Sequence, residues 1–241
     1  MLQTTRAIVL RTIRHGDRGL VLKAFTESSG LRSYMVRTGG KGPSRMAALQ
    51  ALSRVELVVT ESADRDLHQL REVRVERPYT NLPVDPLRGT VALFVQELLV
   101  RVLREESADP MLFEFLQEAL ESLDTAEDLS HFPLLFLVEL SRHLGIDPEA
   151  PVDGADHFDL REGRFVEASR AHGHVIGPPQ SLALAELPTA WRAGSRVDAH
   201  ALRIPGPVRR LLLDQLLLYY RMHLEGLGEL RSPAVLHQVL G

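Results

Sequence analysis

The residues with the clearest chemical role are cations gathered in the first 54 positions. This stretch holds ten Lys or Arg residues against two acidic residues, a net charge of +8 in a chain whose total is −4. The rest of the chain therefore carries −12. Lys and Arg neutralise phosphates, and this contact supplies most of the non-specific affinity of proteins for nucleic acid. The division of charge predicts a polyanion-binding part and a separate acidic part.

Several of these cations fall at turns, at a strand centre or in a Gly-rich loop, where side chains of a small barrel face solvent. They are Arg14, Arg18, Lys23, Arg37, Lys41 and Arg45. Phe25 and Tyr34 are the aromatic residues available for stacking on bases, but both alternate with Val and Leu and are predicted to point into a core. The alternative for the cations is a solvated positive face, or a docking site for an acidic protein.

Residue patterns for catalysis are absent. The stretch Gly39–Ser44 superficially resembles a phosphate-binding loop, but it lacks the required spacing, and Pro43 removes an amide donor. The motifs HExxH, GxSxG and GxGxxG do not occur. We therefore expect no enzymatic active site, because nucleophile, base and oxyanion donors do not converge.

Three histidines, His157, His172 and His174, lie within eighteen residues and could in principle hold zinc. They are the basis for an alternative hypothesis of a metal-dependent enzyme. However, a His-x-His pair in a loop is usually polar surface, so neither a metal nor a cofactor is predicted. The chain has no cysteine, which excludes disulfides, thiolate zinc sites and a cysteine nucleophile.

The elements that position the cations are predicted to be β-strands. Alternation of apolar and polar residues recurs five times within the first 77 residues, and turn signals separate the repeats. The predicted strands are Ala7–Ile13, Leu20–Thr26, Leu31–Arg37, Arg54–Thr60 and Leu70–Val75. Five short strands with cations on the outside indicate an oligonucleotide-binding (OB) barrel, with an SH3-like barrel as the alternative.

The hydrophobic period changes after the Pro-rich segment 78–83, which we take as a domain boundary. Residues 1–78 are predicted to form the barrel. Residues 79–241 are predicted to form an all-helical domain with an irregular or hairpin insert at about 146–204. The predicted fold class is therefore α+β with two domains. Asp85 and Asp109 each precede a Pro and are predicted to cap helices. Ser130 is predicted to cap a third helix. Later helices are expected at 181–191, 208–225 and 234–240.

No segment is predicted to target or cross a membrane. The first residues lack the apolar region of a signal peptide, and the longest apolar stretches are interrupted by polar residues well short of about 18 residues. A cytoplasmic protein is the default expectation.

An ordered set of short stretches resembles the RecO family of bacterial recombination mediators. The resemblance keeps the family's order and spans nearly the whole chain. The matching residues are Ala7–Thr12, His15–Asp17, Leu22–Thr26, Glu27, Gly30, Gly39–Arg45, Leu49–Leu52, Val55–Thr60, Asn81 with the long helix after it, Phe158–Val166, Leu216–His223 and Arg231–Ser232.

The resemblance implies an OB domain that binds single- and double-stranded DNA and anneals complementary strands. It implies action in the cytoplasm, at the nucleoid, with RecR and often RecF to load RecA onto strands coated by single-stranded-DNA-binding protein (SSB). The implied DNA contacts fall on the six cations given above. The resemblance also implies that a hydrophobic pocket of the helical domain binds the acidic, Phe-ended tail of SSB. In this chain we expect that pocket within residues 85–145, at Leu112, Leu116 and Arg142. The alternative hypothesis, a protein–protein adaptor whose basic barrel binds an acidic partner and never binds DNA, stays open.

The chain departs from the family pattern in one place. Many members carry a four-cysteine zinc module after the Phe-Asp-Leu-x-x-Gly hairpin, whereas residues 167–174 contain no cysteine. A zinc site of that kind is impossible here. The resemblance then implies a metal-free branch in which region 150–200 folds by packing alone.

Overall fold

The computed structural model describes residues 2–16, 19–37, 43–61, 66–104, 108–168, 173–191 and 202–240. The chain folds as two compact units. We call residues 1–84 with 95–124 the barrel unit, and residues 85–94 with 125–241 the helical unit. The division between these units falls inside helix α2 (Pro86–Val102), whereas the predicted boundary at 78/79 marks the change of hydrophobic period along the sequence.

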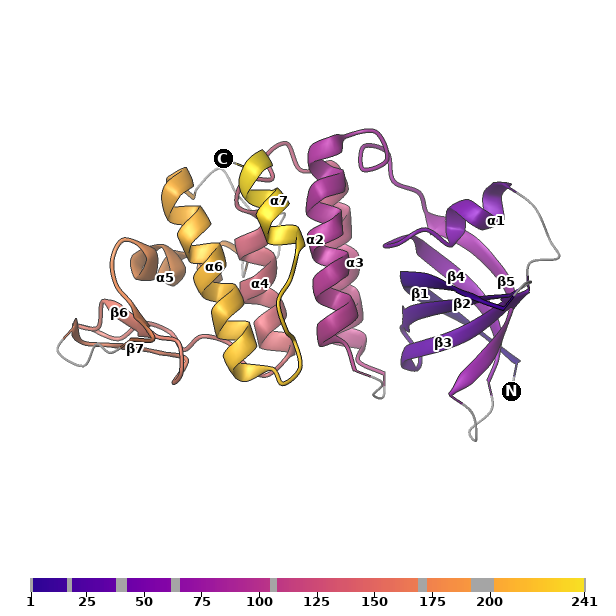
Figure 1. Ribbon diagram of the computed structural model, residues 1–241, viewed down its shortest axis with the longest axis horizontal. Helices are drawn as coiled ribbons and strands as arrows, with labels where there is room; N and C mark the ends of the chain where they lie inside the picture. Colours follow the sequence, from indigo (N-terminus) through magenta and orange to yellow (C-terminus); the bar gives the residue numbers. More distant parts are fainter. Residues whose placement is uncertain are drawn as a thin grey trace. The chain divides into compact units, whose positions relative to one another are not determined.

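Five strands of the barrel unit close into a barrel in the order β1-β2-β3-β5-β4 (Figure 1). All neighbours are antiparallel except β3 and β5, which are parallel. A short helix, α1 (Pro43–Ala48), lies between β3 and β4 in sequence, where a loop was predicted. The strands are β1 (Leu2–His15), β2 (Gly19–Thr26), β3 (Gly30–Arg37), β4 (Arg54–Thr60) and β5 (Leu67–Arg77). The five-stranded closed barrel confirms the predicted OB fold.

Strand alternation fills the barrel interior mainly with aliphatic side chains and one tyrosine. Thr12 Oγ1 donates to the Leu49 carbonyl oxygen at 2.9 Å, so the segment after α1 meets the inner face of β1. The buried interior residues are Ala7, Val9, Leu22, Ala24, Tyr34, Val36, Ala48, Leu49, Val55, Leu57, Val59 and Leu70.

Part of the outer wall of the barrel is covered by α3 (Pro110–Thr125), which belongs to the same unit. Phe25 faces outward from β2, yet it is only 4% exposed, and its ring lies 6.1 Å from the ring of Phe113 on α3. Ile8 and Leu31, its outward-facing neighbours on β1 and β3, are also buried. The covered part of the wall therefore behaves as a second core.

Charged groups hold α3 to the barrel. Arg6 Nη2 pairs with Glu27 Oε1 at 2.6 Å and also with Glu114 of α3. Arg54 is 2% exposed, pairs with Glu121 of α3, and stacks on a tyrosine ring. The pKa of Arg6 lies above its ordinary value, mainly because of the hydrogen bond to Glu27.

The linker after the barrel is anchored to the end of α3. The Asp124 carboxylate accepts the backbone N–H groups of Thr80, Asn81 and Leu82 at 2.7–2.9 Å. Burial alone would raise the pKa of Asp124, but these three donors together hold it below its ordinary value. One carboxylate thus satisfies three consecutive amides that no strand or helix pairs.

The helical unit packs α4, α5, α6 and α7 (Figure 1) with a small sheet whose strand order is β7-β6-β8. Tyr220 of α6 is fully buried and donates to the Leu137 carbonyl oxygen of α4 at 2.6 Å. The helices are α4 (Phe132–His143), α5 (Gln180–Trp191), α6 (Gly206–His223) and α7 (Ser232–Val239). The strands are β6 (His157–Asp159), β7 (Arg164–Val166) and β8 (Val175–Ile176).

Two of the three predicted helix caps are present. Asp85 Oδ1 accepts the N–H of Leu87 at 2.8 Å, and Asp109 Oδ1 accepts that of Leu112 at 2.9 Å. The prediction for Ser130 was wrong: α4 begins at Phe132 and has no side-chain cap. The Ser130 hydroxyl instead donates to Asp128 Oδ2 at 2.9 Å.

The hairpin region is held together by strand pairing and aromatic packing. Strand β8 pairs with β6, and Phe158 contacts the rings of both Phe165 and Tyr219 at centroid distances of 5.1 and 5.9 Å. Gly163 has φ +70°, and a Cβ added there would lie 2.9 Å from the hydroxyl of Tyr219. Within the described residues, no three His, Asp or Glu side chains are placed to hold a metal ion. His172 lies outside those residues.

No helix in the described part of the chain has both the length and the apolar character needed to cross a lipid bilayer.

Candidate nucleic-acid interface

The exposed part of the barrel's outer wall carries a short strip of cationic and aliphatic side chains on β1, β2 and β3. Arg11 lies directly opposite Lys23, which lies opposite Ser33. The next row along the strands has the same outward orientation. We call the six residues the outer strip: Arg11, Lys23 and Ser33, followed by Ile13, Val21 and Met35.

Like charges directly opposite on neighbouring strands repel each other and destabilise a sheet. Arg11 is exposed, and within the described part of the chain no carboxylate pairs with it. Lys23 is half-buried at the centre of β2. A pair of cations held about 4.5–5.5 Å apart at Cβ, by typical cross-strand geometry, is suited to a bound anion such as phosphate.

Arg14 was predicted from its place beside the hairpin turn, and the structure leaves it exposed near the tip of the β1–β2 hairpin. It pairs in register with Leu20 and lies on the opposite face of the hairpin from Arg11. Arg18 and Lys41 lie outside the described residues. Arg37 ends β3 and Arg45 lies in α1, and their side chains are also outside the described set. The assignment of these six cations to DNA therefore stays a prediction.

Sequence reasoning missed Arg11 because of a β-bulge. Unbroken alternation from Ala7 and Val9 would turn Arg11 toward the barrel interior. The register shifts between Val9 and Arg11, which inserts one extra residue and turns Arg11 outward and Thr12 inward. The only sequence signal was the charge itself, since an arginine does not fit a barrel core.

Both candidate stacking residues are buried, but only Tyr34 points into the barrel as the alternation predicted, whereas Phe25 faces outward under α3. Phe25 packs on α3 as described above, and Tyr34 is fully buried. The Tyr34 hydroxyl donates to Glu61 Oε1 at 2.7 Å, and burial, together with this carboxylate, raises the pKa of Tyr34. Neither ring can reach a base on the surface.

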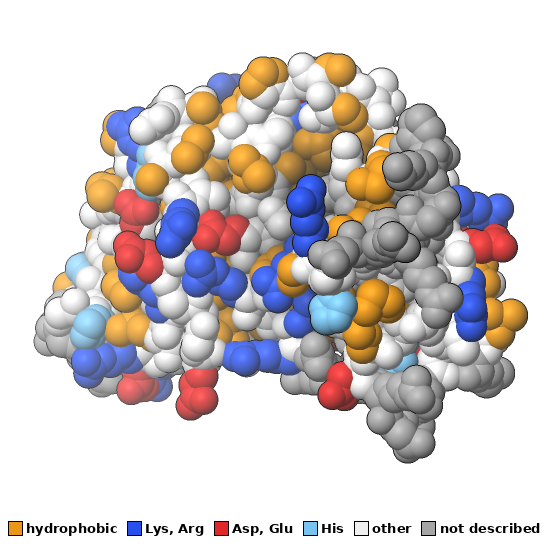
Figure 2. Space-filling model, turned by 45° about the vertical axis from the view of Figure 1, so that its right-hand side comes forward, with side chains coloured by type: hydrophobic (Ala, Val, Ile, Leu, Met, Phe, Trp, Pro, Cys, Tyr) orange, Lys and Arg blue, Asp and Glu red, His pale blue; other side chains and the backbone are white. Residues whose placement is uncertain are grey.

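In the space-filling view, Lys and Arg side chains (blue) lie next to hydrophobic ones (orange), with acidic side chains (red) between some of them (Figure 2). Cationic and apolar groups therefore share the surface shown.

The three residues predicted for an acidic peptide tail are distributed over both units. Leu112 and Leu116 of α3 are 5% and 0% exposed in the barrel unit. Arg142 of α4 belongs to the helical unit, where its side chain is 41% exposed and pairs with Glu139 at 2.8 Å. Their assignment to a common site remains a prediction.

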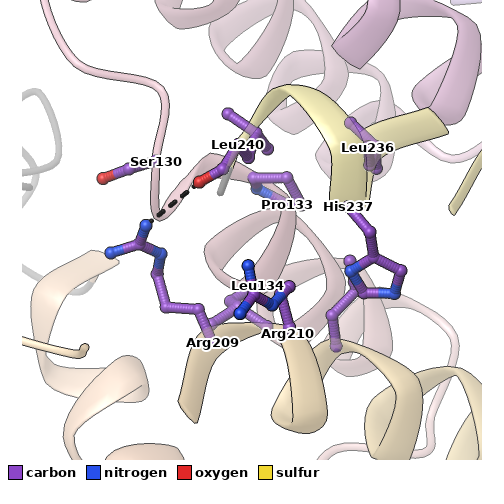
Figure 3. A pocket seen from close by; sticks show the side chains of 9 residues that line it. Ser130, Pro133, Leu134, Arg209, Arg210, Leu236, His237 and Leu240 are labelled. Atoms are coloured by element: carbon purple, nitrogen blue, oxygen red, sulfur yellow. Dashed lines mark hydrogen bonds between the residues drawn. The ribbon is translucent and has the colours of Figure 1, made fainter. Parts of the chain in front are cut away.

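A pocket in the helical unit combines an apolar floor with arginines at its edge (Figure 3). Arg209 and His237 stand on opposite sides, with Pro133 and Leu134 between them (Figure 3). The lining residues come from α4 and the turn before it, from α6, and from α7 and the residue after it: Ser130, Pro133, Leu134, Arg209, Arg210, Leu213, Leu236, His237 and Leu240.

The two arginines of this pocket differ in their availability. Arg209 donates to the carbonyl oxygens of Ile204 and Leu240 at 2.9 and 3.2 Å, so its guanidinium is used within the fold. Arg210 is exposed and, within the described residues, pairs with no carboxylate. His237 is held by Asp214 at 2.8 Å. Arg210 is therefore the cation that can receive an incoming carboxylate.

Comparisons with known proteins agree with this architecture. Residues 1–79 match the family model described as "Recombination protein O N terminal", and residues 83–233 match "Recombination protein O C terminal". Relatives named "DNA repair protein RecO" include one from Christiangramia forsetii, 30% identical over 100% of both chains. Others come from Porphyromonas gingivalis, 31% identical over 98% of both chains, and Flavobacterium johnsoniae, 28% identical over 98% of both.

Proposed function

Because the chain belongs to the RecO family of DNA repair proteins, we propose that it is a recombination mediator that binds single- and double-stranded DNA through its OB barrel. In this role it anneals complementary strands and, with RecR and RecF, helps load RecA onto SSB-coated single strands. It acts without chemistry of its own, in the cytoplasm at the nucleoid.

The observation that carries the DNA-binding proposal is the outer strip together with the exposed hairpin tip. Arg11 and Lys23 lie opposite each other on the barrel wall, and Arg14 extends the charge toward the tip. Barrels of this fold bind single strands along a positively charged groove that follows the backbone. Arg37 at the end of β3, followed by Lys41 and Arg45, continues the run of cations along the sequence.

The test is a salt titration with a fluorescently labelled oligonucleotide. The logarithm of affinity should fall with the logarithm of salt concentration, with a slope of about −0.7 for each phosphate contacted. A Lys41→Glu/Arg45→Glu variant should bind at least about tenfold more weakly, because each reversal removes one phosphate contact and adds repulsion. The matched control is Arg71→Glu/Arg74→Glu, which makes the same charge change at exposed positions of β5. Equal binding by both variants would place the DNA elsewhere.

We also propose that the acidic, Phe-ended SSB tail binds in the pocket between α4, α6 and α7. The apolar floor of Leu134, Leu213 and Leu236 suits an aromatic side chain, and Arg210 suits a carboxylate. Peptide recognition commonly combines such a groove with a charged anchor. The pocket is small, with a cavity volume of about 20 Å³, so Leu240 and Arg210 at its edge must move to admit a ring.

Anisotropy of a labelled acidic peptide ending in Phe tests this assignment. Arg210→Glu should lower peptide affinity about tenfold through repulsion of the acidic residues. Arg221→Glu, at another exposed position of α6, is the control. Arg142→Glu tests the sequence-based site: if this variant fails and Arg210→Glu does not, the tail binds near Arg142. Peptide binding without oligonucleotide binding would favour a protein–protein adaptor instead.

A further inference from the structure

We propose that the barrel holds DNA by its sugar–phosphate backbone and without base stacking, and that Arg11 is a phosphate contact paired across the strands with Lys23. This inference rests on the proposed DNA-binding function and specifies how the barrel performs it. Barrels of this fold usually add stacking on exposed aromatic residues to their cationic groove. In this chain the Phe and Tyr side chains of the barrel pack or form hydrogen bonds within the fold.

The first 84 residues contain three aromatic residues of the Phe, Tyr and Trp types, and each has a role inside the fold. Phe25 packs against Phe113, and Tyr34 is buried with its hydroxyl on Glu61. The Arg54 guanidinium lies 4.6 Å from the centre of the Tyr79 ring. The Tyr79 hydroxyl donates a hydrogen bond to the Leu52 carbonyl oxygen at 2.6 Å. A base that stacked on any of these rings would have to displace a packed element.

Two histidine rings complete the inventory of the barrel. His68 is 7% exposed and packs 5.9 Å from the Tyr34 ring, so it is closed to a ligand. His15 is exposed at the hairpin tip. A single imidazole at a tip offers one contact at most and cannot form a continuous platform for successive bases.

The outer strip offers the groups that backbone binding needs. Arg11 and Lys23 supply charge, and the neighbouring Ile13, Val21 and Met35 supply aliphatic surface. Ile13 is 44% exposed, although isoleucine is among the residue types most often buried. The apolar edge of a deoxyribose can cover it.

This mode has a consequence for substrate choice. Phosphates and sugars are the same in every sequence, so affinity should be independent of base identity and should survive removal of the bases. A stacking mode would lose roughly 5- to 150-fold in affinity for each stacked base removed. The two modes therefore differ by a large factor in one measurement.

The experiment compares a labelled single-stranded oligonucleotide with one of equal length that carries a run of abasic sites, at equal salt. We expect affinities within about twofold of each other. A loss of more than about tenfold on the abasic strand would overturn the proposal, because it would show stacking on a ring or on a guanidinium plane. His15→Ala should change neither affinity, and a selective loss on the normal strand would also overturn it.

A second measurement tests Arg11 directly. Arg11→Ala should reduce the steepness of the salt dependence by about 0.7, the value for one lost phosphate contact. Arg74→Ala is the matched control, since Arg74 is exposed on β5 and pairs with Glu56 at 2.7 Å. An unchanged slope for Arg11→Ala, with a circular dichroism spectrum like that of the parent, would remove Arg11 from the interface.

Failure of this proposal can be distinguished from failure of the proposed function. If the full chain binds neither oligonucleotide at low salt, DNA binding itself is wrong. If it binds the normal strand and not the abasic one, DNA binding stands and the backbone-only mode is wrong.

Discussion

The barrel unit and the helical unit hold their helices in place by different physical means. In the barrel unit, α3 packs on the barrel wall through Phe113, and charged groups tie it down as well: Arg6, Arg54 and Asp124. In the helical unit, the contacts between α4 and α6 are apolar and are completed by the neutral hydroxyl of Tyr220. Burial raises the pKa of Tyr220, so this hydroxyl stays neutral. The barrel unit should therefore respond to pH and charge mutation, and the helical unit to changes in shape.

The charges of the barrel unit themselves fall into two groups. Arg6 and Arg54 are neutralised by carboxylates of α3, whereas Arg11 and Arg14 are exposed, on opposite faces of the β1–β2 hairpin, with no such partner among the described residues. Neutralised arginines stabilise the fold, and unneutralised ones raise the positive potential of the surface. The N-terminal excess of cations therefore serves two purposes, which the charge count alone does not separate.

The largest effect should come from Asp124→Ala. The variant leaves three backbone N–H groups of the linker without their acceptor, which should lower the free energy of unfolding by about 3 kcal/mol. Urea denaturation followed by circular dichroism measures the loss. Glu118→Ala, at an exposed position of α3, is the control and should change stability by less than about 0.5 kcal/mol. Equal stability of the two variants would contradict the role of the charged anchor.

Gly163→Ala tests the importance of shape in the helical unit. Alanine at φ +70° costs about 1 kcal/mol, and its Cβ would also meet the Tyr219 hydroxyl, so we expect a loss of about 2 kcal/mol. Gly154→Ala is the matched control, because it has φ +81° and open space around its Cβ. A Gly163 variant no less stable than the Gly154 variant would show that Tyr219 moves aside freely.

Acid should weaken the barrel unit through Asp124. Its pKa is lowered in the folded state, so the native carboxylate contributes stability that is complete above the unfolded pKa of about 4 and is lost as pH falls through the folded pKa. Asp124→Asn should flatten the stability profile below about pH 4, as measured by urea midpoints across that range. A parallel decline in both proteins would assign acid sensitivity to other carboxylates.

The smallest effect should be a shallow pH dependence in the helical unit. Burial lowers the pKa of His131, Arg209 lowers it further, and Asp128 opposes them. The unfolded chain then binds a proton below about pH 6.5 while the native histidine stays neutral, so stability should fall as pH drops from about 7 toward 5. His131→Gln should remove this slope and His237→Gln should keep it. Thermal melts at several pH values measure both variants.

Much of the fold follows from local patterns in the sequence. Strand alternation predicts all five barrel strands and the inward position of Tyr34, because neighbours on a strand must face opposite sides of a sheet. Asp85 and Asp109 predict two helix starts, because an Asp before a Pro satisfies orphan amides at a position where Pro is tolerated. The cap at Ser130 failed because α4 begins one residue later than predicted, with His131 at the N-cap position.

Residue types and their periodicity were sufficient to predict the barrel and the helices, and the absence of cysteine was sufficient to exclude a cysteine zinc module. Only the folded chain decides where the cations act. A bulge between Val9 and Arg11 turns Arg11 outward, and α3 neutralises Arg54 across 67 positions. The pocket floor likewise joins Leu134 to Leu213 and Leu236. The orientation and the partners of these side chains depend on strand register and on contacts between distant segments. The periodicity of residues along one strand or helix carries no information about either.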